Sequence, residues 1–117
     1  MGHTNVLMQA SRLLEHRAMV IQAAQSYIDF GWMTISKLAN SFKVSENTIT
    51  EWLCEAISNR YVANDYICAQ IMKKHIAEYE QKHNIANSSL REKYKQALTT
   101  RSQTSCSLDI NSILLMI

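Results

Sequence analysis

The sequence predicts an all-α fold. Its 117 residues include no proline and only two glycines, whereas average usage gives about a dozen of the two together. A β-sandwich or barrel needs frequent turns, commonly built from these two residue types, so an all-β architecture is disfavoured. Apolar residues make up 47% and charged residues 19%, which suffices for one core without disulfides. We expect a five-helix domain over residues 1–101, followed by a polar linker and apolar tail over residues 102–117.

The first helix is expected from about residue 5 to residue 29. An apolar residue recurs every seven positions along it, at Leu7, Leu14, Ile21 and Ile28. This spacing gives one broad apolar face. Arg17 interrupts the second apolar row, so a core helix is favoured over a dimeric coiled coil, which stays the alternative. Gly31 is expected to end the helix as a C-cap.

Residues 34–54 predict two short helices joined as a helix-turn-helix core. This motif needs a small residue where the helices approach closely, and Ala39 occupies that position. The apolar positions of the motif are filled by Leu38, Phe42, Val44, Ile49 and Trp52. Thr34 and Ser45 are placed to cap the two helices. Lys43 occupies the turn position that is usually glycine, so we expect a left-handed lysine, at a cost of about 1 kcal/mol. The alternative is a pair of core helices in an ordinary bundle.

Two more helices are expected, over residues 64–83 and 88–100. The apolar stripe of the former includes His75, which we expect to be a core histidine. Asn64 or Asp65 is placed to cap it, and Ser89 and Glu92 have capping-box spacing at the start of the latter. Residues 99–107 predict a linker. The apolar tail, residues 108–117, is expected to dock on its own domain, with docking on a partner as the alternative.

The segment from Tyr27 to Ile49 resembles a known family. It reads Tyr-Ile, five residues, Thr-Ile, then Lys-Leu-Ala, two residues, Phe-Lys-Val-Ser, two residues, Thr-Ile. Over residues 20–84 the chain is similar to the small stage III sporulation transcriptional regulators. The resemblance implies that the second motif helix enters the DNA major groove. The implied groove contacts are Ser45, Asn47, Thr48 and Thr50. The implied contacts with the DNA backbone are Thr34, Ser36 and Lys37, and a basic supplement falls to Lys73, Lys74, Lys82 and His83.

The chemistry of the second motif helix is consistent with base recognition. Asn47 can pair with adenine, Thr50 can touch a thymine methyl, and Glu51 can accept from cytosine N4. Lys43 adds a cation beside the motif, but Glu46 and Glu51 make this helix face acidic. Phosphate contacts are expected from a basic strip formed by Lys73, Lys74, Lys82, Arg91, Lys93, Lys95 and Arg101. The alternative for the strip is an ordinary solvated face.

These patterns predict a sequence-specific regulator of transcription, of bacterial or phage type, that binds double-stranded DNA. The alternative is a protein-interaction module on the same scaffold, such as a mobile-element adaptor, a terminase-like packaging subunit or an inhibitor. A homodimer through the first helix or the tail is a further expectation.

Other function classes are disfavoured by the sequence. Neither a glycine-rich phosphate loop nor a catalytic motif is present, so we expect no enzyme and no cofactor. Cys54, Cys68, His75 and His83 lack the usual zinc-ligand spacing, so we expect no metal. The longest apolar run, residues 113–117, is far too short to cross a membrane. An odd number of cysteines without a secretory leader favours the cytoplasm.

Overall fold

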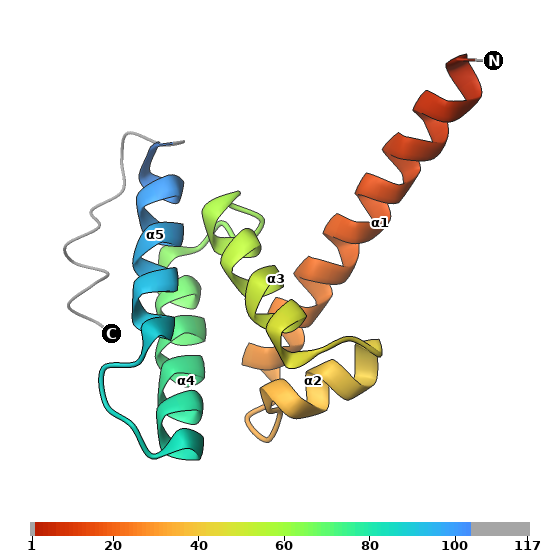
Figure 1. The fold of residues 1–117 in the computed structure, drawn as a ribbon. Coiled ribbons are helices and arrows are strands. Elements are labelled where there is room, and N and C mark those ends of the chain that lie inside the picture. The colour runs from red at the N-terminus through yellow and green to blue at the C-terminus, as the bar shows by residue number, and fades with distance from the viewer. Residues whose placement is uncertain (1, 104–117) are drawn as a thin grey trace.

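The computed structural model describes residues 2–103, with side chains from residue 12 onward (Figure 1). These residues form helices α1 (Gly2–Asp29), α2 (Ile35–Phe42), α3 (Glu46–Ser58), α4 (Asp65–His83) and α5 (Ser89–Gln103). No strand occurs among them, so the all-α prediction is confirmed. The predicted apolar tail lies outside the described residues.

Helix α3 is the centre of the fold. It packs against α1, α2 and α5, while α4 packs against α1 and α5 (Figure 1). Ile49, Leu53 and Ile57, at helical spacing along α3, are fully buried. The core therefore forms around α3, and only part of its surface remains for contact with another molecule.

Helix α1 is a core helix over its C-terminal half only. Its burial begins at Val20, whereas Leu13 and Leu14 are 69% and 67% exposed. The N-terminal half extends away from the other helices (Figure 1). The reason is length: at about 1.5 Å per residue α1 spans about 42 Å, whereas α3 spans about 20 Å and cannot cover all of it.

The predicted C-cap role of Gly31 is wrong. Neither Gly31 nor Gly2 has a positive φ, and nothing lies within 4 Å of the position where a Cβ would stand on Gly31. The end of α1 is instead held by Lys74 of α4, whose Nζ donates to the carbonyl oxygens of Tyr27 and Phe30. A lysine near the last carbonyls satisfies acceptors that the helix itself leaves unpaired.

The turn between α2 and α3 has the predicted caps and the predicted strain. Thr34 accepts from the Lys37 N–H and Ser45 from the Thr48 N–H, each at 3.1 Å. Lys43 is left-handed, with φ 58° and ψ 45°. The Val44 N–H returns to the Ala39 carbonyl at 3.0 Å, as expected where a helix closes through a left-handed residue. These predictions are confirmed.

The predicted capping box at the start of α5 is wrong. Ser88 precedes the helix, and its N–H and hydroxyl both donate to Glu80, at 2.8 and 2.9 Å. Glu80 also accepts from Arg91, and these bonds lower the pKa of Glu80 to about 2. Glu92 pairs with Lys95 instead. The carboxylate that serves this helix start thus comes from α4, at a distance that local spacing cannot reveal.

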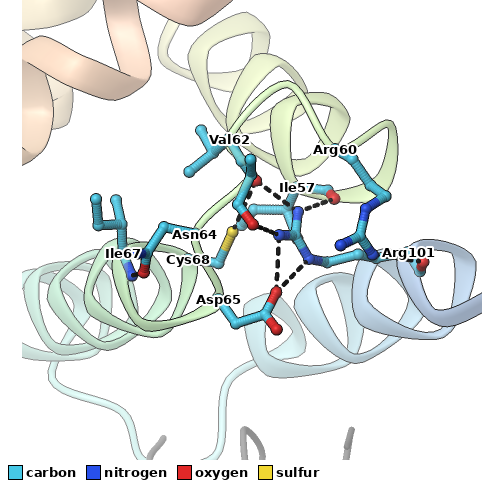
Figure 2. A network of polar contacts seen from close by, with 9 residues as sticks. Ile57, Arg60, Val62, Asn64, Asp65, Ile67, Cys68 and Arg101 are labelled. Atoms are coloured by element: carbon cyan, nitrogen blue, oxygen red, sulfur yellow. Dashed lines mark hydrogen bonds and ion pairs between the residues drawn. The ribbon is translucent and has the colours of Figure 1, made fainter. Parts of the chain in front are cut away.

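Arg101 joins α5 to the segment between α3 and α4 (Figure 2). It is fully buried, and its Nη1 donates to the carbonyl oxygens of Ile57 and Val62, at 3.0 and 2.7 Å. Its Nη2 donates to the Ala63 carbonyl and to Asp65, both at 2.8 Å. Arg101 therefore does not belong to a basic strip on the surface. Helix α5 also continues to Gln103, two residues past the predicted domain boundary.

Candidate nucleic-acid interface

The beginning of α3 is exposed, whereas most apolar positions of the α2–α3 unit are buried. Four apolar motif positions are buried, namely Leu38, Ala39, Ile49 and Trp52. Phe42 and Val44 are half-buried against the same core. Ser45, Glu46 and Asn47 are exposed at the N-terminus of α3, where the free N–H groups and the helix dipole favour anions. This first turn is therefore the part of α3 that can meet a phosphate or a base edge.

Thr50 is nearly buried, although it lines the cleft between α3 and α4, and its predicted contact with a thymine methyl stays a prediction. The residue is 9% exposed, and its hydroxyl donates to the Glu46 carbonyl at 3.1 Å. Helix α5 packs along α3 and restricts its outward face. Thr48 is half-buried, with its hydroxyl 2.9 Å from that of Ser45. Glu51 is exposed beside a cleft that Lys93 of α5 also lines.

The C-terminal half of α4 brings two residues of the predicted basic supplement to the beginning of α3. A cleft of about 310 Å³ between these helices is lined by Asn47, Lys82 and His83, together with Thr50 and the acidic Glu46 and Glu78. The Lys82 Nζ lies 3.2 Å from Glu46 Oε1, so it offsets one of the acidic charges of the helix face. Both groups of this pair are half-exposed. The structure thus places Lys82 and His83, from the predicted basic supplement, next to Asn47.

Lys73 and Lys74 lie away from Lys82 and His83. At about 100° per residue, Lys73 and Lys82 lie on opposite faces of α4, and Lys73 lines a different hollow together with Ile28 of α1. Lys74 is half-buried, and its ammonium group is bonded to the end of α1. Burial lowers the pKa of Lys74. Because α4 presents these lysines toward α1, the predicted basic strip is not continuous.

The remaining predicted contacts lie around α2. Ser36, Lys37 and Lys43 are exposed, whereas Thr34 is half-buried by its role as cap. The Lys37 ammonium lies 5.3 Å from the ring centroid of Trp32, within the range of a cation–π contact, and donates to the Trp32 carbonyl. The exposed cations Lys37 and Lys43 thus stand near opposite ends of α2.

Glu78 of α4 fixes the start of α2 against α1, a role that was not predicted from the sequence. One carboxylate oxygen accepts from the Tyr27 hydroxyl at 2.8 Å and the other from the Ile35 N–H at 2.9 Å. A carboxylate at a helix N-terminus is stabilised by the helix dipole. Burial and Glu78 together raise the pKa of Tyr27. The one feature of the sequence that could have indicated this role is the position of Glu78, three residues after His75 along the apolar stripe of α4.

His75 is a buried core residue, as predicted. Its Nδ1 lies 2.6 Å from the Tyr94 hydroxyl, and burial, with a smaller effect of Lys93, lowers the pKa of His75 to about 4. Among residues 2–103, no three His, Cys, Asp or Glu side chains are grouped to hold a metal ion. Burial also raises the pKa of the Cys54 and Cys68 thiols to about 11, so both stay protonated near neutral pH.

Comparison with known proteins adds no relative. No family model matches the chain, and neither a curated protein nor a solved structure shows significant similarity to it. The resemblance to the sporulation regulators therefore rests on the motif residues alone. None of the helices in the described part of the chain combines the length and the apolar character needed to cross a bilayer.

Proposed function

We propose that this protein is a transcriptional regulator of bacterial or phage type, acting in the cytoplasm, that binds double-stranded DNA through the first turn of α3. The residues around Asn47 support this proposal most directly. It is exposed beside the capped N-terminus of α3, and it shares a cleft with Lys82 and His83. An amide that can read adenine thus stands next to the Lys82 ammonium and the His83 ring, both of which can donate to the DNA backbone.

The paired charges near this site can be exchanged for phosphate. An exposed ion pair such as Lys82 with Glu46 contributes about 0–1 kcal/mol, so a phosphate oxygen can replace the glutamate at little cost. Lys37 and Lys43 are exposed and can reach neighbouring phosphates. We expect base contact mainly from the first turn of α3, because Asn47 is exposed there whereas Thr50 is only 9% exposed. A dimer formed through the exposed Leu13 and Leu14 of α1 would present two such turns to two half-sites.

Two substitutions with a matched control test the proposal. Lys82→Gln should weaken duplex binding on all sequences and reduce the slope of log K against log salt by about 1, because one phosphate contact is lost. Lys73→Gln removes the same charge from the opposite face of α4 and should leave the slope unchanged. Equal slopes for the two variants would contradict the proposed placement of DNA.

The base contact is tested separately. Asn47→Ala should cost about 1–3 kcal/mol on the preferred sequence and much less on unrelated duplexes. Titrations of both duplexes at one salt concentration measure this difference. A loss of the same size on every sequence would remove the role of Asn47 in base recognition.

A protein-interaction module is the second candidate, and the exposed aromatic pair before α2 favours it. Phe30 and Trp32 stack with ring centroids 5.5 Å apart and remain exposed, as aromatic anchors of protein interfaces do. Trp32→Ala separates the two candidates. It should abolish binding to a protein partner, whereas duplex binding should persist with an unchanged salt slope.

A further inference from the structure

An apolar groove runs between α1 and the beginning of α4. It has a volume of about 340 Å³, and its aliphatic lining comes from Ile21, Ala24, Ile28, Val62, Ile67 and Ile71. A second hollow adjoins it, because Ile28 lines both. Ile67 is 37% exposed in this groove, whose lining also includes the polar residues Gln25, Asp29 and Asn64. An apolar hollow of this kind on a small domain indicates a binding surface.

The chain leaves α5 close to the wall of this groove. Figure 2 shows Arg101 donating to the carbonyl oxygen of Val62. Arg101 also donates to the carbonyl oxygen of Ala63, and both Val62 and Ala63 line the groove. Only Ser102 and Gln103 follow Arg101 in α5. The next residues, 104–117, can span about 45 Å when extended, so they are long enough to reach along the groove.

The sequence of residues 108–117 suits a groove of this character. Its apolar residues include a set at positions i, i+3, i+4 and i+7, namely Ile110, Ile113, Leu114 and Ile117. This spacing is typical of a segment that presents one apolar stripe to a hydrophobic groove. Asp109 is the only charged residue in the segment. Arg17 lies beside the groove, with its guanidinium 4.7 Å from the ring centroid of the lining residue Tyr61, and Asp29 is a charged residue of the lining itself.

We propose that residues 108–117 dock within the same molecule, in the groove between α1 and α4. A short tether gives the segment an effective concentration of about millimolar, which favours this occupant over a separate partner. The docked segment covers Ile28 and Ile67, and its Asp109 lies within reach of Arg17. This docking is independent of DNA binding, since it uses the α1–α4 groove and none of Asn47, Lys82 or His83.

A double-mutant cycle on the full chain tests the docking. Ile67→Lys and Leu114→Glu should each lower the folding equilibrium constant, measured by urea unfolding, by about tenfold or more, because each displaces the segment. The double variant should be no less stable than the less stable of the two single variants, since the segment can be displaced only once. The milder pair Ile67→Ser and Leu114→Ser gives the same cycle if a charged variant does not fold.

Ile85→Lys is the matched control. Ile85 is 46% exposed, like Ile67, but it lies between α4 and α5 outside the groove. The factors by which Ile85→Lys and Leu114→Glu lower the folding equilibrium constant should simply multiply in the double variant. Multiplying effects for Ile67 as well would overturn the proposal. The proposal would also be overturned if the coupling between the two substitutions disappeared on dilution while the mass measured by sedimentation halved. In that case the groove would hold the segment of a second copy of the chain.

Discussion

Replacing Arg101 with methionine should strongly destabilise the fold. Methionine keeps much of the side-chain volume but removes the guanidinium donor from the carbonyl groups of Ile57, Val62 and Ala63, of which Ile57 still accepts from the Arg60 N–H and Val62 from the Cys68 thiol. Asp65 loses the guanidinium as well. Removing one partner from a buried charged network costs about 3–5 kcal/mol. At about 4 °C per kcal/mol for a domain of this size, the midpoint of thermal unfolding should fall by about 15 °C.

Urea unfolding followed by circular dichroism measures this loss. Arg91→Met is the control, because Arg91 bonds a single carboxylate, Glu80, and is about one-third exposed. Its loss should be clearly smaller. Arg101→Lys should fall between the two, since lysine retains the charge but lacks the forked geometry that reaches several acceptors at once. If Arg101→Met were no more damaging than Arg91→Met, the view that Arg101 holds α5 to the α3–α4 segment would be refuted.

Three further predictions concern the backbone and two buried groups. Gly31→Ala should stabilise the protein by about 0.4–1 kcal/mol, because Gly31 has an ordinary φ and open space around it, and a measured loss would contradict this. The folded state should lose on the order of 3 kcal/mol of stability as pH falls from about 6.5 to about 4, because only the unfolded chain binds a proton at His75 in that range. Urea unfolding at pH 7 and at pH 5 measures this loss, which should be smaller in the variant His75→Gln than in the unaltered protein. Glu78→Gln should cost about 1–2 kcal/mol, since one neutral amide oxygen replaces a carboxylate that accepts from Tyr27 and Ile35, and an unchanged urea midpoint would remove Glu78 from this role.

Local features of the fold were predictable from the sequence. The helical class follows from the scarcity of glycine and proline, and the caps Thr34 and Ser45 follow from their position before apolar runs. The left-handed Lys43 was predictable because the motif requires that conformation at its turn. Each of these features depends on a few neighbouring residues. Arg60, Asn84 and Asn87 are left-handed too, so in residues 2–103 every left-handed position is held by a residue other than glycine.

The fate of the cations was not predictable, because it depends on contacts between distant segments. Arg101, Arg91 and Lys74 were expected on one surface strip, but they bond to the α3–α4 segment, to Glu80 and to the end of α1. A charge pattern along the chain does not show which charges meet a buried carbonyl. The low exposure of Thr50 was not predictable for a similar reason, since the sequence did not show that α5 lies against α3.

Selection from a random pool of DNA duplexes with the full chain tests the central claim most directly. At low salt we expect one sequence to be enriched, with binding at submicromolar protein that weakens steeply as salt is added. Selection with Asn47→Ala should lose the preference at the base position that this residue contacts, whereas Lys73→Gln should select the same sequence as the unaltered protein. The absence of any enriched sequence, together with undetectable duplex binding at micromolar protein, would contradict the account.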